Sequence, residues 1–320
     1  MKALACALLS LAGAVHAASW QPERNVELIV GTAPGGGSDS TARLMQRLFQ
    51  DKKLIERPAV VSNKPGGGGA MVAAFMTQNA GSAHHLLVVS PTLLTNFILG
   101  KTAVNYTHLT PLAQIGTEYV TFAVPAGSPL RTGKDLAARL QKDAASVSFA
   151  LANALGNHNH SAIAQLSGSV GADVKKLRVA VFNSSSEVAS TVMGGHVDVM
   201  VSPGAATIPH AQSGKLRILA VAAAERQGGA LASVPTWHEQ GIKAVSSNWR
   251  SVVGPAGLRA EHIAYWDSVF AKLVREEDWK KDIAAHHFEN TWLNSADTRK
   301  LMDAQFAELS TTLRALGLAK

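Results

Sequence analysis

The sequence predicts an α/β protein of two lobes, each a mainly parallel sheet flanked by helices. Three observations indicate this fold. Short apolar runs alternate with segments of helical spacing near the N-terminus, a pattern typical of parallel sheets with right-handed crossovers. The same alternation begins again in the middle of the chain, beyond Pro125. Between the two series lies a β-rich run at 114–125, which is long enough for a strand that crosses between lobes.

The first series consists of three strands alternating with two helices, at residues 26–30, 41–49, 58–62, 70–78 and 86–90 in turn. Turn residues bound the apolar runs, which identifies them as strands. In the first helix Ala42, Met45 and Phe49 share one face, so this face is predicted to be buried.

The second series contains a helix at 132–142 and strands at 147–151, 177–182, 197–202 and 216–222. A last strand is predicted at 251–257, and the pattern is helical from Glu261 onward. The predicted lobes are therefore lobe 1, at 18–121 and 246–320, and lobe 2, at 122–245. Two crossings connect them.

The first 17 residues, MKALACALLSLAGAVHA, predict a cleaved secretory signal peptide. They combine Lys2, an apolar stretch too short to span a bilayer, and a small-x-small ending at 15–17. Cys6 is the only cysteine of the chain, so the mature protein is predicted to contain no disulfide. No later segment reaches about 18 uninterrupted apolar residues. These features predict an exported protein of the periplasm.

The charge is moderately basic, because 30 Lys and Arg stand against 23 Asp and Glu, for a formal charge of +7. The cations are scattered at helical spacing, with no dense basic run. A solvated basic surface is the favoured interpretation, and no nucleic-acid partner is predicted.

Two glycine turns, at 35–37 and 66–69, follow the first two predicted strands. Carboxyl ends of parallel strands form the binding edge of such sheets. Without Cβ atoms the backbone approaches a ligand closely, and free N–H groups at a helix start favour an anion. The turns therefore predict a backbone cradle for one anionic group, with plain tight connections as the alternative. Nucleotide motifs are excluded, because GxxxxGK[ST] is absent and neither turn completes GxGxxG.

Histidine and serine patterns do not predict a metal site or an enzyme. The pairs at 84–85 and 158–160 lack ligand partners at metal-binding spacing, and His238 does not begin a complete HExxH. GxSxG is absent, so the remote alternative of a periplasmic hydrolase depends on Ser90 with His160 as nucleophile and base. No cofactor is predicted.

An ordered set of motifs covers the chain: APGGGSDSTARL, NKPGGGGA, GNHNHSAIAQL, GGHVDVMVSPGAATIPHAQSGKLRILAV, SVPTWHEQGI and NWRSVVGPAG. In this order they resemble the extracytoplasmic solute receptors of tripartite tricarboxylate transporters, the TctC or Bug family. The resemblance implies a type II periplasmic binding protein with two hinge crossings. It also implies that the lobes close on a small organic carboxylate.

Matching positions imply the ligand-binding residues. The two glycine loops and the turn after the third strand supply Gly36, Gly37, Ser38, Asp39, Gly67, Gly68, Gly69, Ser90 and Thr92 from lobe 1. Lobe 2 supplies Asn157, His160, Asn183 and Asp198. Asn183 stands where the family frequently has a lysine, so the selective end of the site differs. Arg250 is an auxiliary candidate, with a packing or rim role favoured.

The resemblance further implies a partner, a membrane permease of one large and one small transmembrane subunit, and a monomeric receptor. A receptor that feeds a signalling system remains an alternative, because both functions need only a surface that depends on closure.

Overall fold

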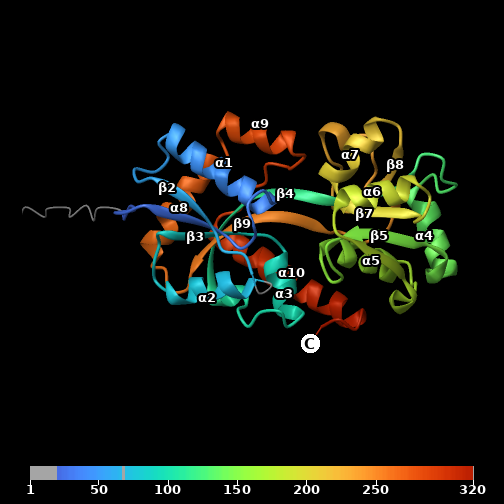
Figure 1. Ribbon diagram of the computed structural model, residues 1–320, viewed down its shortest axis with the longest axis horizontal. Coiled ribbons are helices and arrows are strands. Elements are labelled where there is room, and N and C mark those ends of the chain that lie inside the picture. The colour runs from blue at the N-terminus through green and yellow to red at the C-terminus, as the bar shows by residue number, and fades with distance from the viewer. Residues whose placement is uncertain (1–19, 67–68, 320) are drawn as a thin grey trace, which may run out of the picture.

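The computed structural model describes residues 20–66 and 69–319, arranged as two lobes side by side (Figure 1). The predicted signal peptide with Cys6, and Gly67 and Gly68 of the second glycine turn, lie outside the described residues. Within those two ranges, no helix is both long and apolar enough to cross a membrane.

Lobe 1 is built on a five-stranded sheet. In spatial order its strands are β2 (Ala59–Asn63), β1 (Val26–Val30), β3 (His85–Val89), β9 (Ser247–Pro255) and the first part of β4 (Leu109–Pro125). The first three strands are parallel, whereas β9 is antiparallel to both β3 and β4. Its helices are α1 (Gly37–Asp51), α2 (Ala70–Gln78), α3 (Thr92–Ile98), α8 (Ala260–Leu273), α9 (Glu277–Ala285) and α10 (Ser295–Ala315).

Lobe 2 repeats this plan. Its strands are β6 (Arg178–Phe182), β5 (Ser148–Ala152), β7 (Val199–Pro203), the last part of β4, and β8 (Leu216–Val221). The first three are parallel, and β4 is antiparallel to β7 and β8. Its helices are α4 (Gly133–Lys142), α5 (His158–Ser169), α6 (Ser185–Met193) and α7 (Gly204–Gln212).

Two long strands join the lobes. β4 pairs with β9 up to Tyr119, which lies opposite Ser247, and then pairs with β7 from Val120 onward. β9 follows directly on Ser246, whose N–H donates to Ala222 of lobe 2. A third connection is made by α10, from which Glu308 accepts a hydrogen bond from Gln165 of α5.

Each lobe has its own apolar core on both faces of its sheet. In β1 the side chains of Leu28 and Val30 join the core under α1 and α8, and Ile29 joins the core under α2 and α10. This alternation follows from the period of two along a strand. The predicted buried face of α1 is confirmed, since Ala42, Met45 and Phe49 are buried.

The fold predicted from the sequence is confirmed, with three main differences in extent, the first being that the strand predicted at 114–125 begins at Leu109. The strand predicted at 251–257 begins at Ser247 and forms the second crossing. The helix predicted at 41–49 begins at Gly37, so the last glycine of the turn is its first residue. Boundaries set by tertiary pairing are the least visible in a single sequence.

Candidate functional site

The binding edges of the two lobes face each other, and strand directions show why. β4 runs from lobe 1 to lobe 2, and β3 points the same way because each is antiparallel to β9. β7 is antiparallel to β4, so it runs back toward lobe 1. The carboxyl ends of the two parallel sets therefore face each other. The helices that follow these strands, α1, α2 and α3 from lobe 1 and α5, α6 and α7 from lobe 2, begin at these facing edges, and the space between the edges is called the cleft below.

The three helices of lobe 1 begin without a side-chain cap among the described residues. Their N-cap residues are Gly36, Gly69 and Pro91, none of which provides a capping side chain. The first N–H groups of a helix have no intrahelical partner, and the helix dipole makes this end positive. The N–H groups of Gly37 and Ser38 at the start of α1 therefore remain available to an anion, whereas Leu93 N and Leu94 N of α3 already donate to Ser90 O and Pro91 O.

Asp39 holds the first glycine loop in place and is not free for a ligand. Its carboxylate is 2% exposed and accepts three bonds of 2.9 Å, from the Gly35 N–H, Arg43 Nε and Asn63 Nδ2. Hydrogen bonding by Arg43 and Gly35 lowers the pKa of Asp39 to about 2. This placement contradicts a direct ligand contact, because the oxygens already have partners. Asp39 is a positioning residue for the loop.

The second glycine turn and the turn after β3 lie beside the first loop. Gly69 has φ of +98°, a left-handed conformation that favours glycine, and its N–H donates to Gly66 O at 3.1 Å. Ser90 Oγ donates to Thr92 Oγ1 at 3.1 Å, and the Thr92 side chain is exposed. The Thr92 hydroxyl therefore keeps its own proton to donate next to the start of α3.

The lobe 2 candidates at the start of α5 behave differently, because their side chains already have backbone partners and Asn157 caps the helix. Asn157 Oδ1 accepts from His160 N at 3.0 Å, and its Nδ2 donates to Ala152 O at 2.9 Å. His160 Nδ1 accepts from Gly156 N at 3.0 Å, so the ring proton lies on Nε2. Burial lowers the pKa of His160 to about 4. The ring is therefore neutral at physiological pH and offers one N–H.

Asn183 precedes α6 and is exposed to solvent. Its backbone N–H donates to Glu187 Oε2, while Ser184 Oγ accepts from Glu187 N and caps the helix. Its amide side chain carries no charge. The cleft-facing turn of α6 therefore presents a neutral group.

Asp198 lies at the wrong end of lobe 2 for a ligand contact. It precedes β7, and its carboxylate accepts from both N and Oγ of Ser148, at 2.8 and 2.7 Å, at the start of β5. The two strands are parallel, so these residues mark the amino edge, opposite the cleft. This contradicts the predicted role of Asp198, which ties two strand beginnings together.

A buried polar cluster at the crossing strands was missed by the sequence analysis. Glu118 is 4% exposed and accepts from Ala205 N, at the start of α7, and from Asn248 Nδ2 at 3.2 and 3.3 Å. Burial raises the pKa of Glu118 to about 7, against the opposing effect of Arg250. The one charged residue in the β-rich run at 114–125 is Glu118, and this is the sequence signal that could have found it.

Arg250, the auxiliary candidate, belongs to the same cluster, and its side chain extends to the start of α1. Its Nη1 donates to Asn248 Oδ1 at 2.9 Å, and its guanidinium carbon lies 5.1 Å from the ring centre of Phe288. Its buried Nε has no partner in the described part of the chain. A Cβ added at Gly37 would lie 2.6 Å from Nη2. The guanidinium therefore lies directly beside the start of α1.

The family model of the tripartite tricarboxylate transporter family receptors, TctC, matches residues 42–318. The chain belongs to this family. Among curated proteins it is 25% identical over 303 residues to the UPF0065 protein in the gbd 5' region of Cupriavidus necator, with 93% of this chain and 89% of that protein covered. It is 28% identical over 241 residues to protein BugT of Bordetella pertussis, with 74% and 72% covered.

Solved structures support the fold of this receptor. A TctC solute binding protein from Polaromonas, without ligand, aligns with a TM-score of 0.80 and 22% identity, over 92% of this chain and 99% of that one. A protein of R. palustris with adipate aligns with a TM-score of 0.74 and 20% identity, over 93% and 99%. MatC from Rhodopseudomonas palustris with bound malate gives 0.67 and 20%, over 92% and 99%.

The receptor's geometry does not support the remote hydrolase interpretation. Ser90 donates to Thr92 in lobe 1, whereas His160 lies in lobe 2 with its Nδ1 bonded to Gly156. A nucleophile needs a base within hydrogen-bond reach. In the residues that the structure describes, no three His, Cys, Asp or Glu side chains gather as metal ligands. Family relatives are solute receptors rather than enzymes.

Proposed function

We propose that this receptor binds a small organic carboxylate in the cleft and delivers it to a membrane permease of one large and one small subunit. One observation carries the proposal. Three helices of lobe 1 start without side-chain caps in the described structure, at the same cleft edge where Arg250 reaches Gly37. Free N–H groups, helix dipoles and a guanidinium all favour a negative charge.

Lobe 1 supplies the first contacts to the ligand carboxylate. The donors are the backbone N–H groups of Gly36, Gly37 and Ser38, with the hydroxyl of Thr92, which itself accepts from Ser90 Oγ. Asp39 holds the first glycine loop in place by accepting a hydrogen bond from the Gly35 N–H. Backbone donors are fixed and uncharged, so they bind a carboxylate without leaving an unpaired buried charge when it departs.

Lobe 2 adds contacts when the lobes close. The predicted boundaries, with lobe 2 at 122–245, lie within a few residues of the change of partner after Tyr119 and of the second crossing at Ser247. We place the hinge there. The Nε2–H of His160 and the amide of Asn183 would reach the ligand in the closed form. Only such contacts, absent from the open form, stabilise closure.

Related proteins support two parts of the proposal, namely a carboxylate ligand and its delivery to a transporter. The solved structures with adipate and with malate both contain small carboxylates. The family is described as the receptor of a tripartite transporter, which supports delivery to a permease; we propose that the receptor acts as a monomer. A signal peptide at 1–17 would bring the chain to the periplasm, where such receptors work.

Calorimetry against a carboxylate panel tests the proposal. We expect malate and adipate to bind, and adipamide, which lacks the charges, to bind at least tenfold more weakly. Citrate should bind more weakly than malate, because Asn183 offers no charge for a third carboxylate. A receptor that binds neither acid would contradict the proposal. A citrate affinity above that of malate would contradict the role given to Asn183.

A further inference from the structure

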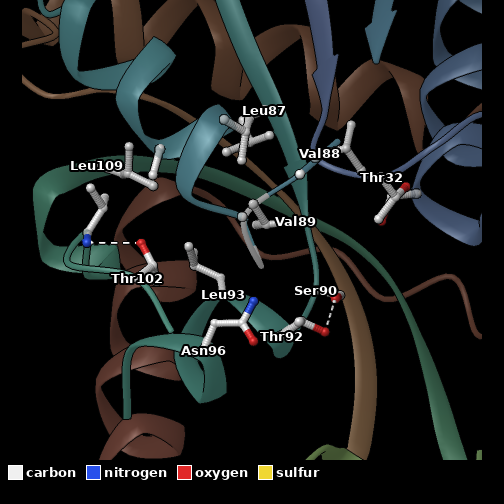
Figure 2. A pocket seen from close by; sticks show the side chains of 17 residues that line it. Thr32, Leu87, Val88, Val89, Ser90, Thr92, Leu93, Asn96, Thr102 and Leu109 are labelled. Carbon is white, nitrogen blue, oxygen red and sulfur yellow. Dashed lines mark hydrogen bonds between the residues drawn. The ribbon is translucent and has the colours of Figure 1, made fainter. Parts of the chain in front are cut away.

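Beside the proposed carboxylate site, lobe 1 contains a cavity of about 320 Å³. It lies between the ends of β1 and β3, the helices α2 and α3, and the segment that leads to β4. Figure 2 shows Val89 and Leu93 in its middle, with Thr32, Ser90 and Thr92 on one side and Leu109 on the other. Lobe 2 contributes no lining residue in the described structure.

The lining of this pocket is mostly apolar and uncharged among the described residues. Its walls are Val72, Ala73, Leu87, Val89, Leu93 and Leu109. No described residue that lines it is charged. Its polar lining groups away from the helix starts are the amide of Asn96 and the hydroxyl of Thr102, which already accepts from Val104 N at 3.2 Å. A second carboxylate placed there would lose its hydration without gaining a counter-charge, which is costly.

The mouth of the pocket coincides with the carboxylate site. Ser38 lies in the first turn of α1, Gly69 is the N-cap of α2, and Ser90 and Thr92 flank the start of α3. All four also line the pocket. An acid bound at the helix starts would therefore have the pocket directly behind its carboxylate, so one molecule can occupy both.

The size of the pocket limits that molecule. An apolar cavity of about 150 Å³ accepts benzene. A cavity of about 320 Å³ therefore has room for a single ring or a chain of roughly eight carbons. A short polar acid would leave most of this apolar surface unused.

We propose that the ligand is a monocarboxylate with an apolar body, such as a medium-chain acid, whose tail fills the lobe 1 pocket. This inference rests on the proposed function, since the carboxylate must first bind at the helix starts. Within the carboxylates, the ligand class is then the monocarboxylates with an apolar body. The uncharged pocket then selects against a second carboxylate at the far end.

Calorimetry with acids of increasing length is the first test, using butanoate, hexanoate and octanoate. Each buried methylene should tighten binding about fourfold, so octanoate should bind about 15-fold tighter than hexanoate. Suberate, the eight-carbon diacid, should bind at least tenfold more weakly than octanoate. Flat affinities along the series, or suberate binding more tightly than octanoate, would overturn the inference.

Two neighbouring alanines of α2 provide a matched pair of variants. Ala73 lines the pocket and is 9% exposed, whereas Ala74 is exposed on the other side of the helix. Ala73→Leu should weaken octanoate about tenfold and leave butanoate within twofold, because only the longer tail reaches the added carbons. Ala74→Leu should change neither affinity. If Ala73→Leu does not fold, Val104→Phe at the half-buried pocket edge should reproduce the loss.

The outcomes separate the two proposals. Binding of malate and adipate without any dependence on chain length or on Ala73→Leu refutes the apolar tail and keeps the carboxylate receptor. Absence of binding by every acid refutes both. A length dependence that Ala73→Leu and Val104→Phe both leave unchanged would locate the tail elsewhere and refute the lobe 1 pocket.

Discussion

The two edges of the cleft are built from the same element, a strand followed by a helix start, yet they treat that start differently. In lobe 1 the starts of α1, α2 and α3 have no side-chain cap within the described ranges. In lobe 2 Asn157 caps α5, Ser184 caps α6, and Glu118 accepts from the start of α7. An uncapped helix start costs stability unless a ligand satisfies it. The difference supports the proposal that lobe 1 binds the anion first and that lobe 2 then closes over it.

Two buried carboxylates, Asp39 and Glu118, also differ in the protonation state that their surroundings favour. Asp39 in lobe 1 accepts three short hydrogen bonds and has a pKa lowered to about 2. Glu118 at the crossing accepts two longer bonds, and burial raises its pKa to about 7. Donor number and geometry, rather than burial alone, decide which form is stable. The following predictions test this comparison, starting with the largest effect.

Glu118→Gln should remove a pH dependence of about 3 kcal/mol from the free energy of unfolding. The pKa is about 4.5 when unfolded and about 7 when folded. The folded state therefore binds the proton more tightly, so this stabilisation is present below pH 4.5 and is lost as the pH rises through 7. Urea unfolding of both proteins from pH 4 to pH 8 measures the difference. Parallel pH profiles would show that Glu118 has an ordinary pKa.

Asp39→Asn should lower the free energy of unfolding by about 2 kcal/mol at pH 7 and weaken acid binding. The carboxylate has a pKa of about 2 when folded and 3.8 when unfolded, so its contribution exists above pH 3.8 and is lost as the pH falls through 2. Asp198→Asn is the control, because it lies at the far edge of lobe 2. That control should keep full acid affinity, and a loss there would restore Asp198 to the site.

Gly37→Ala should raise the dissociation constant for a bound acid about tenfold, because the added Cβ would displace Arg250 from the start of α1. Gly204→Ala is the matched control, since Gly204 is the first residue of α7 and its Cβ would meet only ordinary contacts near 3.5 Å. Calorimetry with adipate compares them. Equal affinities for both variants would remove Arg250 and Gly37 from the proposed site.

Ser184→Ala should give the smallest effect, a loss of about 1 kcal/mol of stability with acid affinity within twofold. The hydroxyl caps α6 by accepting from Glu187 N and is satisfied within lobe 2. Urea unfolding and calorimetry on the same sample measure both quantities. A large loss of affinity with unchanged stability would mean that this helix start binds the ligand.

Much of the candidate site could be predicted from the sequence because it is local. Glycine turns after apolar runs, and the cleft-edge positions of Gly37, Ser90 and Asn157, follow from motifs a few residues long. Asp39 and Asp198 were placed correctly in their segments but given the wrong contact, because a side chain's partners come from other segments. For Asp39 that partner is Asn63, and for Asp198 it is Ser148.

The sequence by itself determined the alternation of strands and helices, the two series, and the glycine turns that begin the helices, because each depends on neighbouring residues. Only the tertiary structure decided which edge of each sheet faces the cleft, since that depends on β9 running antiparallel to β3 and β4. The same holds for Glu118 and Arg250, which meet at the crossing of two strands far apart in the chain. Burial and pairing over such separations set their charge, and no local pattern contains that information.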